Sequence, residues 1–107
     1  MPYDAGLAAR VQDALAVLGE RHARQKNVFG GRGFLTGKHT FVIDWDDALL
    51  VKTPPAEYAG LLAVPGVTPF APDGERPMGS WLVVAADVVA DDPELAEWVA
   101  RGLRAVR

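Results

Sequence analysis

The sequence predicts an α+β fold in which helices flank a single antiparallel four-stranded sheet, in the order α-β-β-β-α-β-α. Apolar residues recur every three or four positions near both ends of the chain, as in amphipathic helices. In the middle of the chain they alternate with polar residues, and short turn signals separate the segments, as in strands. Because 107 residues is the length of one ordinary domain, we expect residues 1–107 to form a single domain.

The first helix is predicted over residues 5–25, with Asp4 as its N-cap. Basic residues close the predicted helix, where cations interact favourably with the helix dipole. The apolar stripe that should face the sheet has spacings of three and four and comprises Leu7, Val11, Leu15 and Leu18.

Three strands are predicted next, over residues 27–35, 39–45 and 48–53. Three glycines interrupt the first of them, and glycine inside a strand usually marks a bulge or a close backbone approach. Two tight turns, at 36–38 and 46–47, connect the three strands into an antiparallel meander.

The second half of the chain should contribute two helices and one strand. Residues 54–63 have a helix start with proline in the first turn. Residues 65–79 contain four prolines and three glycines, which predicts a loop. The strand predicted over 80–86 is apolar on both faces, so we expect it to lie inside the sheet or to be covered on both sides. The acidic stretch 91–94 opens the last helix.

Composition restricts the classes of function. The chain has no cysteine, which excludes disulfides, thiolate metal sites and a cysteine nucleophile. Neither a signal peptide nor a membrane span is visible, so we expect a cytoplasmic protein. The formal net charge of −3 argues mildly against general nucleic-acid binding. Residues 1–38 nevertheless carry a net charge of +3, from six basic and three acidic residues.

The basic residues of this first part are the candidate contact set for nucleic acid or another anion: Arg21, Arg24, Lys26, Arg32 and Lys38. The alternative is a solvated face that is balanced by the acidic remainder of the chain. The run Gly30-Gly31-Arg32-Gly33 resembles an anion cradle, but a strand follows it where a phosphate loop would need a helix. We therefore interpret its glycines as allowing a bend or a close approach.

No residue pattern predicts catalysis, a cofactor or a metal. His22 and His39 have no third ligand at a paired spacing. The three aspartates at 44, 46 and 47 surround a turn, which explains them without a cation. Ser80 does not lie in the Gly-x-Ser-x-Gly pattern of a nucleophile elbow. We expect a protein that is not an enzyme.

The three tryptophans have different predicted roles. Trp98 lies on the apolar stripe of the last helix, and Trp81 opens an apolar strand, so both are expected in the core. Trp45 is next to the aspartate turn, and we expect it to be partly exposed. An exposed aromatic side chain at a sheet edge would indicate a partner surface.

A series of segments gives the chain a family resemblance. It begins with Phe29-Gly30-Gly31-Arg32-Gly33-Phe34-Leu35, Gly37-Lys38 and the stretch 45–52. It continues with 55–58, 65–70, 76–78, 81–84 and 95–99. In this order the segments resemble the N-terminal domain of the TfoX/Sxy family of competence regulators, over about residues 5 to 105.

This resemblance implies the α+β fold. It also implies a regulatory, non-enzymatic role through contacts with a protein partner or with a second copy of the chain. The chain departs from the family at Asn27 and Val28, where members often carry Arg-Met, and at Lys52, where they often carry arginine. Full-length regulators resemble this chain only in their first half, because their second, helical domain has no counterpart in this sequence.

A weaker resemblance is to the MmcQ/YjbR family, which shares the Phe-Gly motif, the Gly-Lys hairpin and a Trp-Leu-Val strand. That resemblance implies a small DNA-binding module that uses the N-terminal basic face. Two functional hypotheses therefore lead: a protein-interaction module that pairs through a sheet edge in 27–35 or 80–86, and a nucleic-acid-binding module. An enzyme acting on a small metabolite ranks third.

Overall fold

A computed structural model describes residues 4–107 of the chain. Helix α1 spans Ala5–Val17 and starts as predicted, because the Asp4 carboxylate accepts hydrogen bonds from the backbone N–H groups of Gly6 and Leu7. The predicted end at residue 25 is wrong. Gly19 adopts a left-handed φ of +79°, and hydrogen bonds from Gly19 to Ala16 and from Glu20 to Leu15 close the helix in a Schellman motif.

The segment predicted as one strand over 27–35 is a hairpin. Strand β1 (Arg24–Val28) pairs antiparallel with strand β2 (Gly31–Thr36), and Phe29 and Gly30 form the turn between them. Both turn residues have positive φ, +54° and +79°, as in a type I′ turn. The glycine-rich run thus turns the chain, and the expected bulge lies further along, where the β2–β3 register shifts.

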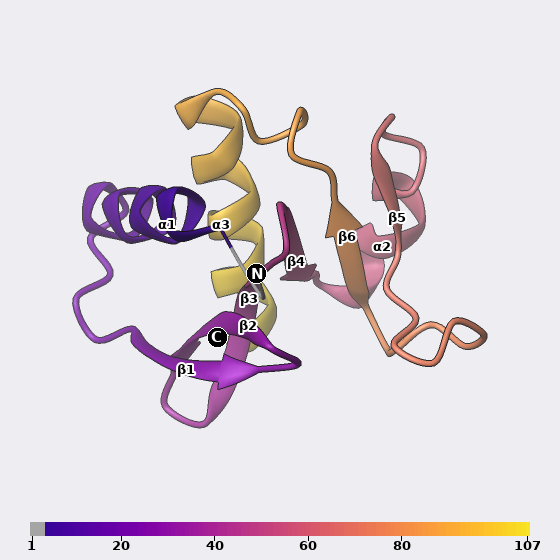
Figure 1. The fold of residues 1–107 in the computed structure, drawn as a ribbon, viewed down its shortest axis with the longest axis horizontal. Helices are drawn as coiled ribbons and strands as arrows, with labels where there is room; N and C mark the ends of the chain where they lie inside the picture. The colour runs from indigo at the N-terminus through magenta and orange to yellow at the C-terminus, as the bar shows by residue number, and fades with distance from the viewer. Residues whose placement is uncertain (1–3) are drawn as a thin grey trace.

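The predicted positions of the next two strands are confirmed by β3 (His39–Trp45) and β4 (Ala48–Lys52). Strand β6 (Trp81–Val84) is shorter than predicted. The loop predicted over 65–79 contains a further strand, β5 (Val67–Pro69), which pairs with β6. The antiparallel α+β class is therefore confirmed, but the sheet formed within residues 4–107 has six strands instead of four, and the predicted chain order is wrong. The elements follow one another as α-β-β-β-β-α-β-β-α, and the strands lie side by side in the order β1-β2-β3-β4-β6-β5 (Figure 1).

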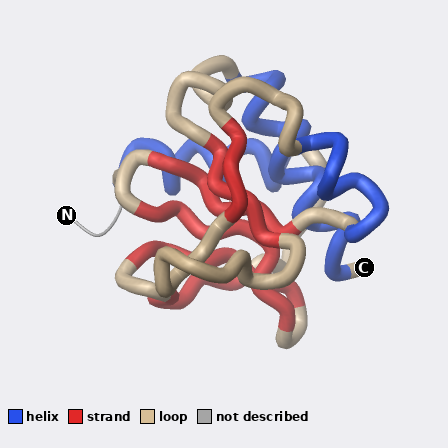
Figure 2. The backbone as a smooth tube through the Cα atoms, turned by 90° about the vertical axis from the view of Figure 1, so that its right-hand side faces the viewer, coloured by secondary structure: helices blue, strands red, loops and turns tan. Residues whose placement is uncertain are grey.

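The helices cover one face of this sheet, as the turned view shows (Figure 2). Helices α1, α2 (Pro55–Leu61) and α3 (Asp92–Val106) all contribute to the larger hydrophobic core, which lies between them and the sheet. Of the predicted stripe on α1, Leu7, Val11 and Leu15 are buried. Leu18 is 41% exposed because the helix ends before it.

A smaller core lies on the opposite face, where Ile43 and Leu50 pack with Phe70 from the loop after β5. The half-buried side chains Trp45 and Trp81 pack against this cluster, whereas Trp98 of α3 is buried in the larger core. The prediction for Trp98 is confirmed, and so is the partial exposure of Trp45. Trp81 is less buried than predicted because it lies at the start of β6 on this thinner side.

Candidate functional site

Three of the five predicted basic residues lie on or beside strand β1. Arg24 and Lys26 are two residues apart on the strand, so their side chains leave the same face of the sheet. The Arg24 guanidinium donates a hydrogen bond to the carbonyl oxygen of Gly37, in the turn that also contains Lys38. Arg24, Lys26 and Lys38 thus form a cationic edge at one side of the sheet.

The other two residues lie elsewhere. Arg32 is the direct cross-strand partner of both Asn27 and Asp44, which places its side chain on the opposite face from Lys26. Its guanidinium donates to the Asn27 side-chain oxygen over 3.4 Å. Arg21 lies in the connection between α1 and β1 and borders a hollow beside α1. The five predicted residues therefore do not form one surface.

Strand β1 is an edge strand. Four of its five residues are exposed, and no other strand in residues 4–107 pairs with its outer side. The opposite edge of the sheet, β5, is only three residues long and ends in Pro69, which has no N–H group to donate. Of the two edges, β1 is the one that offers a row of backbone groups to a partner.

An aromatic groove lies at the end of the sheet that carries the β1–β2 turn. The ring of Phe29 packs edge-to-face on Phe70 with a centroid distance of 5.6 Å, and Trp45 packs on the same ring from 5.7 Å. Phe29 is 51% exposed. The groove has a volume of about 380 Å³ and is lined by Phe29, Trp45, Pro69, Phe70, Ala71, Pro72 and Val83.

Sequence reasoning found only Trp45 of this aromatic set. Phe29 occupies the first position of a type I′ turn, where asparagine or glycine is usual, because a left-handed backbone costs a residue with a Cβ about 1–2 kcal/mol. An aromatic residue directly before Gly30 was the signal that could have identified it. Phe70 could not be assigned, since it joins the groove only through tertiary packing.

Backbone strain is concentrated at this end of the sheet. Phe29 and Asp46 are the non-glycine residues with positive φ in the described part of the chain, at +54° and +56°. Phe29 lines the groove, and Asp46 directly follows the groove residue Trp45. Strained residues of this kind cluster at functional sites more than elsewhere, which makes the groove a candidate binding site.

Asp44 differs from its neighbours in the aspartate run. It lies on β3 with no exposed surface, whereas Asp46 and Asp47 are exposed at the turn. Neither of its carboxylate oxygens has a hydrogen-bond partner among residues 4–107. Burial raises the pKa of Asp44 to about 7, and the negative charge of Asp4 acts in the same direction. The backbone N–H groups of Asp4 and Ala8 act in the opposite direction.

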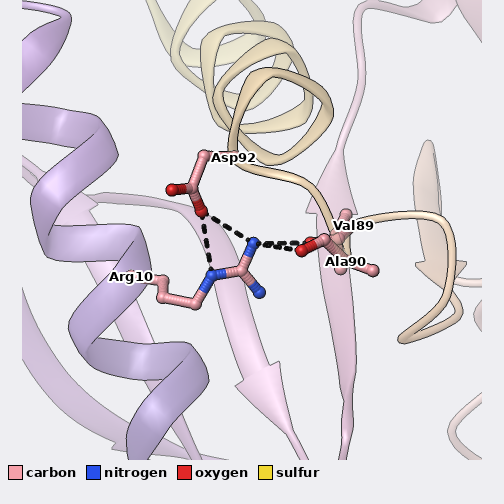
Figure 3. A network of polar contacts seen from close by, with 4 residues as sticks. All are labelled: Arg10, Val89, Ala90 and Asp92. Carbon is pink, nitrogen blue, oxygen red and sulfur yellow. Dashed lines mark hydrogen bonds and ion pairs between the residues drawn. The ribbon is translucent and has the colours of Figure 1, made fainter.

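Arg10 of α1 forms hydrogen bonds with the first residue of α3 and with two residues that precede this helix (Figure 3). Its guanidinium donates to the Asp92 carboxylate at 3.0 and 3.1 Å, and to the carbonyl oxygens of Val89 and Ala90 at 2.9 and 3.0 Å. These four hydrogen bonds join α1 to the chain around the start of α3, so we interpret the network as structural. Within the described residues, no group of three or more histidine, aspartate or glutamate side chains is arranged to hold a metal ion.

The geometry defines a small two-layer α+β domain with one exposed cationic edge and one aromatic groove. A family model described as the TfoX N-terminal domain matches residues 13–106. The chain therefore belongs to the TfoX N-terminal domain family, and the predicted resemblance is confirmed. Comparisons with curated proteins and with solved structures find no match. No helix in residues 4–107 is long and apolar enough to cross a membrane.

Proposed function

We propose that this TfoX N-terminal domain is a non-enzymatic protein-interaction module with a regulatory role in the cytoplasm, and that β1 is the element that contacts the partner. The observation that carries the proposal is the exposed outer side of β1. An unpaired edge offers main-chain hydrogen bonds to an extended segment, and side-chain contacts on alternate residues then provide specificity.

The charges on β1 favour a partner that differs from this chain. Antiparallel self-pairing centred on Lys26 would place Lys26 directly opposite its own copy, and like charges in that position are destabilising. An extended segment with acidic side chains would instead face both Arg24 and Lys26 favourably. We therefore propose an acidic partner strand and treat a homodimer as an alternative outcome of the test.

Light scattering and partner binding test this proposal together. The first step is to measure the mass of the protein at high concentration, where a monomer agrees with a different partner and a dimer supports self-pairing. The second is to compare binding of acidic extended peptides by the wild type, by Lys26→Glu, and by Arg76→Glu, an exposed control in the loop after β5. Loss of binding in Lys26→Glu alone supports the edge. The proposal is contradicted if the protein is a monomer, binds none of the peptides and retains no partner in a pull-down from cell lysate.

A second candidate is nucleic-acid binding, which the approach of Arg24 to the turn of Lys38 favours. The net charge of −3 and the separate position of Arg32 count against it. The test is a fluorescence titration of labelled duplex DNA at low and physiological salt. Micromolar affinity that weakens steeply with salt, and that is lost in Arg24→Glu/Lys38→Glu, would support phosphate contacts. Absence of binding at low salt would exclude this candidate.

A further inference from the structure

The aromatic groove combines features that folding alone does not require. Phe29 is half-exposed, and its ring contacts Phe70 at the edge of the smaller core. An asparagine or glycine at the same position would form the type I′ turn without left-handed strain. The sequence therefore places a large aromatic surface at the rim of the groove against the local preference of the backbone.

Two exposed aspartates are direct sequence neighbours of residues that line the groove. None of the residues that line it is charged, and none of their immediate sequence neighbours is basic. Asp46 directly follows Trp45, and Asp73 directly follows Pro72. The Asp73 carboxylate accepts hydrogen bonds from the backbone N–H groups of Arg76 and Glu75, which lower the pKa of Asp73.

Aromatic faces beside carboxylates are a suitable environment for a cation. The groove is open along the end of the sheet, whereas sites for whole small molecules usually enclose most of the ligand. An open groove of this size is better suited to one side chain presented by a longer chain.

We infer that the groove binds a peptide segment of a partner protein through an arginine side chain, with the guanidinium over the rings of Phe29 and Trp45 and near Asp46 and Asp73. This inference goes beyond the edge pairing proposed for β1. It uses different residues and the opposite charge, so either surface can fail without the other.

The experiment is a nuclear magnetic resonance titration of the ¹⁵N-labelled full chain. The probe is the peptide acetyl-Gly-Ser-Arg-Ser-Gly-amide, and its matched control replaces arginine by citrulline, which has nearly the same shape but no charge. The readouts are the indole N–H signal of Trp45 and the backbone amides of Phe29 and Gly30. We expect the arginine peptide to shift these signals with a millimolar dissociation constant, and the citrulline peptide to bind at least fivefold more weakly.

Two variants locate the interaction. Phe29→Asn creates an Asn-Gly type I′ turn, which preserves the hairpin while it removes the ring, and should weaken binding at least fivefold. Asp46→Asn removes one charge at a position that tolerates a left-handed backbone, and should weaken binding two- to threefold. Equal binding of the two peptides would overturn the inference, and that comparison needs no variant. Shifts confined to residues outside the groove, or unchanged binding by Phe29→Asn, would overturn it as well.

Discussion

The helix-covered face and the groove end of the sheet use backbone freedom in opposite ways. On the covered face, Gly102 of α3 lies so close to β3 that an added Cβ would be 2.7 Å from the carbonyl oxygen of Phe41. There a glycine allows close packing. At the groove end, Phe29 and Asp46 occupy left-handed conformations without being glycine, and Phe29 remains half-exposed. The first region uses a glycine for close packing, whereas the second holds residues with a Cβ in left-handed conformations.

The largest effect should come from Gly102→Ala. Replacing glycine by alanine in a helix normally stabilises it by about 1 kcal/mol. Here the new Cβ would meet backbone atoms of β3, and overpacking typically costs about 1–3 kcal/mol or more. We expect the clash to dominate and the free energy of unfolding to fall by about 2 kcal/mol, as measured by urea denaturation.

Gly60→Ala is the matched control. Gly60 lies in α2, and nothing lies within 4 Å of the Cβ that this change adds. The free energy of unfolding should therefore rise, by up to about 1 kcal/mol. If both variants changed stability in the same direction, close packing at Gly102 would not explain its presence in α3.

Asp44 gives the covered face a pH dependence. Its pKa is about 7 in the folded chain against an ordinary value of 3.8, so the folded state holds this proton more tightly between those values. The contribution of Asp44 to stability is therefore favourable at low pH and is lost as the pH rises toward 7. One pKa unit corresponds to about 1.4 kcal/mol.

Asp44→Asn removes this titration and should stabilise the protein at pH 8 by on the order of 2 kcal/mol, after allowance for relaxation around the charge. The difference from the wild type should shrink toward pH 4. Denaturation curves at several pH values measure it, with the exposed Asp47→Asn as the control for loss of one surface charge. A stability difference that does not change with pH would show that Asp44 is not held in an unfavourable charged state.

The turns at the two ends of the β1–β2–β3 meander provide a smaller contrast. Gly37 has a φ of +58° and open space around it, so Gly37→Ala should cost about 1 kcal/mol through backbone strain alone. Phe29→Asn relieves such strain but loses an edge-to-face contact worth about 0.5–1.5 kcal/mol, so its net effect should be near zero. Thermal unfolding compares the two. A larger loss for Phe29→Asn would mean that the ring serves the fold.

Much of the fold was predictable, and the errors have definite physical causes. The positions of β3, β4 and the start of α1 follow from alternation, turn chemistry and a side-chain cap. The predicted end of α1 is wrong because Gly19 adopts a left-handed conformation that ends the helix before the basic residues that follow it. Strand β5 escaped prediction because three residues ending in proline carry no pattern, and only pairing with β6 defines them.

The candidate site was predictable in part for a related reason. The five basic residues form one predicted contact set because they lie in one part of the sequence. The structure brings Arg24 to the turn of Lys38 because strand β1 pairs with β2, whereas the sequence predicted a helix end and a single strand there. Arg32 is separate from them, because alternation along β2 directs its side chain to the other face. The groove needs Phe70, which is distant in sequence from Phe29, so no local pattern could have brought the two rings together.

The last comparison concerns the contacts that Arg10 makes between α1 and the start of α3. Asp92 is 87% exposed, and exposed ion pairs contribute about 0–1 kcal/mol, so Asp92→Asn should change stability by less than about 0.5 kcal/mol. Arg10→Ala should cost more, about 1–2 kcal/mol, because it also leaves the carbonyl groups of Val89 and Ala90 without their donor. Equal effects of the two substitutions in urea denaturation would assign the stabilisation to the charge pair. A larger effect of Arg10→Ala would assign the stabilisation to the hydrogen bonds with Val89 and Ala90, whose contribution should depend little on salt.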